Sequence, residues 1–153
     1  MLIRETESSD LDALVALEQA CFDSPWSEKA IASELSKETT EGWLLSDSNR
    51  AVGFILFQHI LDECELLRVA VSPSFRRRGA AESLIRHGLD HLIDAGAETC
   101  FLEVHGDNGS AVGLYKKLGF KVSGERKSYY SDGGDAQIMS ANLTERCPPP
   151  RST

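Results

Sequence analysis

The pattern of apolar and polar positions divides the chain into a series of short strands and helices. Apolar residues recur every three or four positions in some segments, and they alternate or run continuously in others. Strands are predicted over residues 2–5, 42–46, 51–59, 65–71, 99–104 and 136–141, with one more after residue 118; helices are predicted from Leu11, from the segment 24–28, and over residues 80–95 and 108–118. This order predicts an α/β fold with a mixed sheet and helices on both faces.

Polar residues at the ends of these segments support the assignment. Ser8, Ser9 and Asp10 supply capping oxygens for the first helix, and Ser27 caps the second, with Pro25 in its first turn. Residues 47–50 favour a hairpin, and residues 132–135 favour a turn before the last strand. Two strands, residues 65–71 and 99–104, are apolar enough to be covered on both faces.

Composition limits the class of protein. The chain has 153 residues, of which 41% are hydrophobic, enough for one packed domain, expected over residues 1–145. The proline-rich segment 146–153 is expected to be a flexible tail. No apolar run approaches the length of a membrane span, and the N-terminus lacks a signal-peptide pattern, so a cytoplasmic protein away from membranes is expected.

Charge and cysteine usage narrow the partners. The 24 acidic residues outnumber the 16 basic ones, giving a net charge of −8. Direct binding of nucleic acid is not expected, because contact with phosphates needs clustered Lys and Arg, and a basic partner suits the chain better. The cysteines are scattered without a C-x-x-C pair, which predicts free thiols in a reducing compartment: Cys21, Cys64, Cys100 and Cys147.

The segment from Val69 to Glu82 combines a strand, an arginine-rich turn and the start of a helix. Backbone N–H groups at a helix start attract anions, and the consecutive arginines from Arg76 to Arg78 add charge-assisted hydrogen bonds. The turn therefore predicts a phosphate site. A dinucleotide loop of the form G-x-G-x-x-G is a weak alternative, because Gly79 is the only glycine in the segment. Taken alone, the turn also fits a solvated basic cap.

Two motifs resemble those of the GCN5-related N-acetyltransferase (GNAT) superfamily. Arg76-x-x-Gly79-x-Ala81 resembles its pyrophosphate loop, Q/R-x-x-G-x-G/A, and the preceding Val-Ala-Val-Ser-Pro matches its fourth strand and exit. Residues 108–120 resemble its segment N-x-x-A-x-x-L-Y-x-x-x-G-F. The two motifs follow in the family's order, and the resemblance implies the GNAT fold, in which acetyl-CoA lies between splayed central strands.

The resemblance extends to the RimI branch, the ribosomal-protein-alanine N-acetyltransferases. Residues 22–28 look like F-x-x-P-W-S-E, and Leu102-Glu103-Val104 followed by Asn108 and Tyr115 looks like the branch's catalytic core. Residues 126–136 are similar to R-x-x-Y-Y-x-x-x-x-x-D-A, and eukaryotic N-terminal acetyltransferases carry a similar stretch. The similarity spans nearly the whole chain except the tail. It implies acetyl transfer from acetyl-CoA to a protein N-terminus.

The resemblance also implies roles for individual residues. Glu103 is expected to be the general base for the acceptor amine, and Tyr115 the proton donor to the departing CoA thiolate. Tyr129 and Tyr130 are expected to clamp the backbone of the entering peptide. The residues expected to bind acetyl-CoA are Val69, Ala70 and Val71 on the strand; Arg76, Arg77, Arg78, Gly79, Ala80, Ala81 and Glu82 in the turn and helix start; and Asn108.

The chain departs from the family pattern at two of these positions. Ala81 replaces the commoner glycine, and Glu82 places a carboxylate near the expected phosphates, which weakens binding unless it points outward. Each residue with an expected catalytic or peptide-binding role also has a purely structural interpretation. A lone glutamate at a strand end such as Glu103 is usually a surface carboxylate, and Tyr115 fits a packed ring. Tyr129 and Tyr130 fit ordinary strand aromatics as well as they fit a peptide clamp.

Two other patterns carry less weight. His87 and His91 have the spacing of a zincin pair, but Gly88 stands where the catalytic glutamate belongs, so no metal site is expected. Cys100 lies inside a predicted buried strand, so we expect it in the core rather than acting as a nucleophile.

The resulting hypothesis is direct acetyl transfer to a protein N-terminal α-amine, that of a basic ribosomal protein, by a monomer or weak dimer. An α-amine has a pKa of about 7.7–8.0 against about 10.4 for lysine, so it needs only modest help from a base. Two alternatives stay open: a lysine side chain or small amine as the acceptor, and a non-catalytic module that senses acetyl-CoA.

Overall fold

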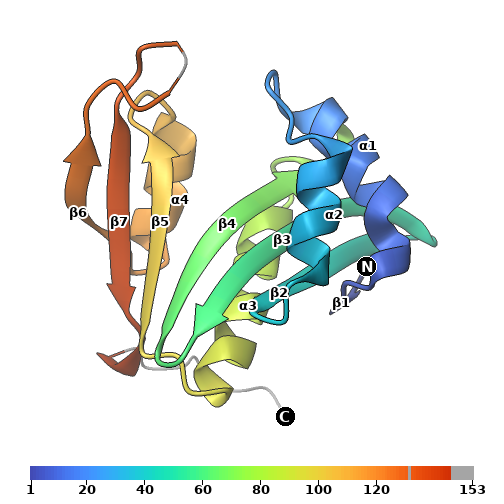
Figure 1. The fold of residues 1–153 in the computed structure, drawn as a ribbon, viewed down its shortest axis with the longest axis horizontal. Coiled ribbons are helices and arrows are strands. Elements are labelled where there is room, and N and C mark those ends of the chain that lie inside the picture. Colours follow the sequence, from blue (N-terminus) through green and yellow to red (C-terminus); the bar gives the residue numbers. More distant parts are fainter. Residues whose placement is uncertain (131, 146–153) are drawn as a thin grey trace.

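A computed structural model describes residues 1–130 and 132–145. In this part of the chain the strands form one sheet in the order β1-β2-β3-β4-β5-β7-β6, in which β4 and β5 are parallel and the other neighbours antiparallel (Figure 1). The strands are β1 (Leu2–Glu5), β2 (Thr40–Asp47), β3 (Arg50–Ile60), β4 (Glu63–Val71), β5 (Thr99–His105), β6 (Lys121–Arg126) and β7 (Ala136–Asn142). The α-helices are α1 (Leu11–Cys21), α2 (Glu28–Ser36), α3 (Ala80–Asp94) and α4 (Gly109–Lys117).

The helices cover opposite faces of this sheet (Figure 1). Leu14 of α1 and Ile31 of α2 pack with Phe54 and other sheet residues into one apolar cluster. A larger cluster on the opposite face joins the sheet to α3 and α4. The predicted order of elements and the mixed sheet with helices on both faces are therefore confirmed.

Short polar sequences lie at the start of α2 and in the turn between β2 and β3, as predicted. Ser27 caps α2, because its hydroxyl accepts a hydrogen bond from the Ala30 N–H at 3.1 Å. The turn between β2 and β3 has Ser48 and Asn49 at φ values of 50° and 66°, which is the type I′ geometry that suits the twist of a hairpin.

Two predicted helix starts are wrong in detail. Residues Ser8–Asp10 form a 3-10 turn ahead of α1, and the Asp10 carboxylate accepts the Glu7 N–H at 2.7 Å instead of capping the helix. Pro25 precedes α2, which begins at Glu28. The carboxylate of Glu18 accepts the Trp26 N–H at 2.8 Å and holds this connector outside the helix.

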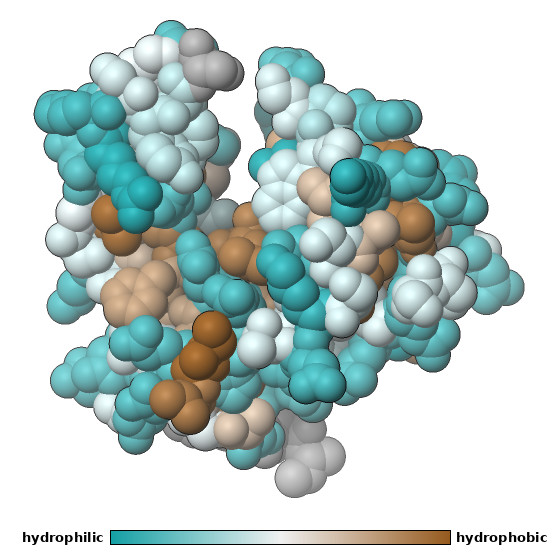
Figure 2. Space-filling model, viewed as in Figure 1, coloured by the Kyte–Doolittle hydropathy of each residue, from teal (hydrophilic) through white to brown (hydrophobic). Residues whose placement is uncertain are grey.

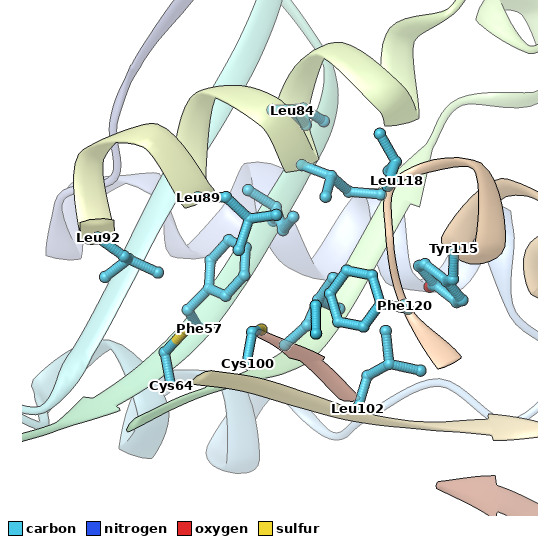
Figure 3. Packing of buried hydrophobic residues seen from close by; sticks show 14 of the residues in the cluster. Phe57, Cys64, Leu84, Leu89, Leu92, Cys100, Leu102, Tyr115, Leu118 and Phe120 are labelled. Carbon is cyan, nitrogen blue, oxygen red and sulfur yellow. The ribbon is translucent and has the colours of Figure 1, made fainter. Parts of the chain in front are cut away.

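The larger apolar cluster fills the space between the sheet and α3 (Figure 3). Leu84, Leu89 and Leu92 of α3 are fully buried in it. Gly88 allows the close approach, since a Cβ at that position would clash with the Phe57 ring. Cys100 is fully buried in the same cluster, as predicted for a core residue.

A β-bulge in β4 changes which face its side chains use. Phe57 of β3 pairs with Leu66, whereas Leu56 pairs with Arg68, so Leu67 is the extra residue. In an unbroken strand alternate residues share one face. Here Leu66 packs on the α3 face while Ala70 packs on the α1 face, because the extra residue reverses the alternation.

The bulge coincides with the point where β4 and β5 separate. Their parallel pairing ends at Leu66 opposite Leu102, and no later residue of β4 pairs with β5 in the register. Figure 1 shows the two strands diverging beyond this point. The splayed central strands implied by the family resemblance are therefore present.

The prediction that both central strands are covered on both faces is wrong for β5. Burial alternates along it: Cys100, Leu102 and Val104 are buried, while Phe101 and Glu103 are only partly buried. The open face belongs to the side on which α1 and α2 lie, because α1 packs mainly on β3 and β4 and α2 on β2, rather than on β5.

Within residues 1–130 and 132–145, no helix is long and apolar enough to cross a membrane. Cys21 and Cys64 are free thiols, as predicted, and Cys100 forms no disulfide among the described residues. Cys147 and the predicted flexible tail, residues 146–153, lie outside the described residues.

Candidate active site

The opening between β4 and β5 leads into a cavity of about 520 Å³. All three β4 residues predicted to bind the cofactor line it, together with Arg76, Arg77, Ala81, Asn108 and Tyr115. A second cavity of about 220 Å³ continues along the start of α3, lined by Gly79, Ala80, Ala81 and Glu82 among others. The fold therefore gathers these predicted residues into one continuous region.

The backbone between β4 and α3 presents a row of free donors to this region. In the described residues, no N–H from Arg77 to Glu82 donates a hydrogen bond to another residue. Gly79 has a φ of 74° and Arg77 a φ of 65°, so both lie in the left-handed region that turns the chain into the helix. Successive free N–H groups at a helix start form a binding site for phosphate oxygens.

The three arginines of this turn have different contacts. Arg76 Nε donates to the Val71 carbonyl at 3.2 Å and ties the turn to the end of β4. The Arg78 guanidinium lies over the Phe75 ring, 4.9 Å from its centroid. Arg76 and Arg77 both line the larger cavity, so two of the three predicted phosphate-binding arginines face it.

Glu82 does not oppose an anion in this region, because its charge is already paired. Its carboxylate binds Lys117 Nζ at 2.7 Å and Arg86 Nε at 3.1 Å. These two hydrogen bonds lower the pKa of Glu82. The negative charge that this departure from the family pattern introduces is therefore paired with Lys117, at the end of α4.

Asn108 and Tyr115 reach the cavity from α4. Asn108 is the N-cap of this helix, and its Oδ1 accepts the Ala111 N–H at 3.3 Å. The Tyr115 ring lies edge-on to Phe120 at 5.9 Å in the core (Figure 3). Burial raises the pKa of the Tyr115 hydroxyl to about 12, so it holds its proton at all ordinary pH values.

Glu103 belongs to the opposite face of the sheet, where it is surrounded by charged and aromatic groups. Its carboxylate lies 3.4 Å from Arg126 Nε, and its side chain is 24% exposed. It lines a cavity of about 270 Å³ together with Glu65, Arg126 and others. Burial and the charge of Glu103 raise the pKa of Glu65. The negative charge of Glu103 and a hydrogen bond to it raise the pKa of Tyr129.

Tyr130 is held beside this carboxylate by a histidine. Its ring stacks on His105 at 4.9 Å with an interplanar angle of 17°. His105 Nδ1 accepts the Asp107 N–H at 3.1 Å, so the neutral ring carries its proton on Nε2, which donates to Asp132 at 2.9 Å. Tyr129 lies edge-on to Tyr130 at 5.2 Å. The two tyrosines therefore border the open face of β5.

The other border of this open face comes from the end of α1 and the connector to α2. Cys21 and Phe22 line the larger cavity, and Cys21 Sγ donates to the Val71 carbonyl at 3.2 Å. Figure 2 shows the face hollowed between the β5–β7 side and the α1–α2 side. We call this hollow the acceptor groove. Its floor is β4 and β5, the α1–α2 connector with Phe22 and Trp26 is on one side, and the β6–β7 connector with Tyr129 and Tyr130 is on the other (Figure 1).

Sequence reasoning missed several residues of the groove. Arg68, Glu65 and His105 were assigned no role, because each is an isolated residue in a strand. Phe22 and Trp26 belong to the segment 22–28, which resembles the RimI motif F-x-x-P-W-S-E. That motif is the feature of the sequence that could have pointed to these two residues as part of the groove.

Comparison with known proteins adds to this geometry. The sequence model of the acetyltransferase (GNAT) family matches residues 11–120. The chain belongs to the GNAT family. It is 36% identical over 141 residues to the ribosomal protein bS18-alanine N-acetyltransferase of Escherichia coli strain K12, covering 91% of this chain and 95% of the relative.

Solved GNAT structures agree with this membership. The crystal structure of the ribosomal-protein-S18-alanine N-acetyltransferase from Escherichia coli superimposes with a TM-score of 0.89 at 36% identity, covering 93% of both chains. The crystal structure of Arabidopsis thaliana NAA60 in complex with acetyl-CoA has a TM-score of 0.83 at 17% identity, covering 94% of this chain and 98% of that one. At this identity the similarity shows a shared fold only. The predicted GNAT fold and the resemblance to the RimI branch are confirmed, and the chain is an acetyltransferase.

The histidines with zincin spacing have a packing role. The rings of His87 and His91 lie 5.9 Å and 5.2 Å from the Trp43 ring. In residues 1–130 and 132–145, no three His, Cys, Asp or Glu side chains are grouped so as to hold a metal ion.

Proposed function

We propose that this GNAT enzyme transfers the acetyl group of acetyl-CoA to the N-terminal α-amine of a ribosomal protein that begins with alanine. The observation that carries the proposal is the 36% identity, over nearly the full length of both chains, to an enzyme named for that reaction. The architecture supports it, because a cavity suited to a pyrophosphate-bearing donor and a groove suited to a chain acceptor lie on either side of the same opening.

Acetyl-CoA occupies the cavities along β4 and α3 in this proposal. The free N–H groups from Arg77 to Glu82 bind the pyrophosphate, aided by the nearby arginines. Val69, Ala70 and Val71 offer backbone groups to the pantetheine arm where β5 has separated from β4, and the Asn108 amide reaches the same arm. The acetyl group then lies at the opening.

The acceptor amine enters from the groove. Glu103, directly or through a water, takes a proton from the protonated acceptor amine before its nitrogen attacks the acetyl carbonyl, because only the neutral amine is a nucleophile. Tyr115 gives its proton to the CoA sulfur as the C–S bond breaks. Its raised pKa means that the proton is present throughout the working pH range.

The peptide backbone lies between Tyr129, Tyr130 and the α1–α2 connector. The net charge of −8 and the glutamates of the groove favour a basic N-terminal segment, such as those of many ribosomal proteins. The enzyme works in the cytoplasm as a monomer or weak dimer, with residues 1–145 as one catalytic domain, and needs no metal.

The test is thiol release from acetyl-CoA with a matched set of acceptors. The set contains basic peptides that begin with alanine or serine, the same peptides with a blocked N-terminus, and a polyamine. Turnover with the free peptides alone, with a mass shift on the first residue, supports the proposal. Turnover with blocked peptides or the polyamine alone assigns the enzyme a lysine or small-amine acceptor instead. Binding of acetyl-CoA without any turnover points to the sensing module.

A further inference from the structure

Arg68 lies directly after the bulge of β4, on the floor of the acceptor groove. Its Nε and Nη2 donate to the two carboxylate oxygens of Glu18 at 2.8 Å and 2.7 Å. Its guanidinium lies 3.6 Å from the centroid of the Phe22 ring and 5.0 Å from that of Trp26. The pair therefore connects β4 to α1 and to the connector that forms one side of the groove.

The third nitrogen of this guanidinium is available. Nη1 makes no hydrogen bond within residues 1–130 and 132–145, and Gln137 Oε1 is the one buried side-chain polar atom found there without a partner. Nη1 is therefore open to solvent, in agreement with the 21% exposure of the Arg68 side chain. Two rings and a carboxylate hold it in one orientation.

Arg68 lies within electrostatic reach of Tyr130, which is on the tyrosine side of the groove. Burial and the charge of Glu103 raise the pKa of Tyr130, and the positive charge of Arg68 acts in the opposite direction. Arg68 and Tyr130 are thus close enough to interact electrostatically across the groove. A peptide lying between the tyrosines and the α1–α2 connector passes over Arg68.

The buried partner changes what Arg68 can bind. Glu18 is fully buried and offsets the charge of the guanidinium. A bare arginine would repel a cationic N-terminus and a basic peptide, whereas the Arg68–Glu18 pair carries no net charge and still has N–H donors. The matching acceptor for such a donor is a neutral carbonyl oxygen rather than a phosphate or carboxylate.

We propose that Arg68 is a substrate-binding residue whose Nη1 donates to a backbone carbonyl near the N-terminus of the acceptor, so that the enzyme selects a peptide over a simple amine. The inference rests on the proposed function and adds a residue that discriminates peptides from polyamines. Glu18, Phe22 and Trp26 position Arg68 and take no part in its hydrogen bond to the acceptor.

The test pairs an enzyme variant with an altered substrate. The variant is Arg68→Gln, and the substrates are an alanine-starting peptide and two analogues in which the first or the second carbonyl is reduced to a methylene. With the wild-type enzyme, one reduction is expected to raise KM for the peptide about 10-fold to 100-fold, the range of a lost hydrogen bond to a charged donor. In Arg68→Gln, KM for the unaltered peptide should rise by a similar factor. The analogue whose reduced carbonyl raised KM for the wild-type enzyme should then bind the variant no more weakly than the unaltered peptide does.

Controls separate binding from folding. KM for acetyl-CoA is expected to be unchanged in Arg68→Gln, because Arg68 does not line the cavities along β4 and α3 that this proposal gives to acetyl-CoA. Because this variant leaves Glu18 buried without its partner, the double variant Glu18→Gln with Arg68→Gln, which keeps an acceptor for Trp26 N–H, is measured in parallel with thermal unfolding. The wild-type analogue series stands even if both variants unfold.

Two outcomes overturn the inference, and they differ from failure of the proposed function. Arg68 does not bind these carbonyls if neither carbonyl reduction raises KM for the wild-type enzyme. The same conclusion follows if the reductions raise KM for the variants as much as for the wild type. If the wild-type enzyme acetylates no peptide N-terminus, the proposed function fails and this inference fails with it.

Discussion

Glu103 and Tyr115 lie on opposite faces of the sheet, on either side of the opening between β4 and β5. Glu103 extends from the open face of β5 into the acceptor groove, whereas Tyr115 lies with α4 against the buried face. In the proposed reaction the base therefore approaches from the acceptor side and the acid from the CoA side.

Replacing Glu103 by Gln should lower kcat/KM for a free N-terminal peptide about 100-fold at pH 7, near the lower end for general-base catalysis. The deficit should shrink toward pH 9, because an α-amine with a pKa of about 8 is then mostly neutral. The measurement is the pH profile of kcat/KM. Glu63→Gln, at a position lining the same cavity, is the control. An equal deficit at pH 6 and pH 9 would contradict the role as base.

Replacing Tyr115 by Phe should lower kcat about 100-fold and leave KM for acetyl-CoA nearly unchanged, because the ring and its contact with Phe120 remain. Burial raises the pKa of Tyr115 to about 12, so the hydroxyl stays protonated below that pH. The wild-type kcat should therefore show no fall between pH 7 and pH 10 from loss of this proton. If the wild-type kcat falls with a pKa near 10 and that of Tyr115→Phe does not, the Tyr115 hydroxyl loses its proton in this range, which would contradict the prediction.

The turn before α3 should control binding of acetyl-CoA more than turnover. Arg77→Ala combined with Arg78→Ala should raise KM for acetyl-CoA more than it lowers kcat. Gly79→Ala should act in the same direction, because its φ of 74° costs an alanine about 1 kcal/mol although the space around it is empty. Steady-state kinetics with varied acetyl-CoA gives both values. A fall in kcat with KM unchanged would mean that the turn does not bind phosphate.

Two glycines should respond oppositely to alanine. Gly88→Ala should destabilise the protein by about 1–3 kcal/mol, because the new methyl group clashes with Phe57 and crowds Trp43. Gly113→Ala, on the exposed side of α4 with nothing within 4 Å, should stabilise it by about 0.5–1 kcal/mol through helix propensity. Urea unfolding monitored by tryptophan fluorescence measures both. Similar effects at the two positions would show that packing at Gly88 is not the cause.

The shape of the turn before α3 and the start of α4 could be predicted from sequence because their geometry is local. The turn from Arg76 to Ala81 takes its shape from a few neighbouring residues, with Gly79 supplying the left-handed conformation. Asn108 caps the helix that carries Tyr115 a short distance along the chain. The alternation of apolar residues likewise set the order of strands and helices, because each period depends on one segment alone.

The acceptor side depended on contacts that no short segment contains. The bulge at Leu67 arises from the register between β3 and β4, and it turns Arg68 toward Glu18, fifty positions away in the sequence. Glu65 and Glu103 influence one another only because β4 and β5 pair in parallel across a helical crossover. Sequence alone thus determined the fold class and the conformation of the turn before α3, because both are set by short-range backbone preferences. Tertiary structure alone decided which charges face the acceptor, because packing and strand register bring distant residues together.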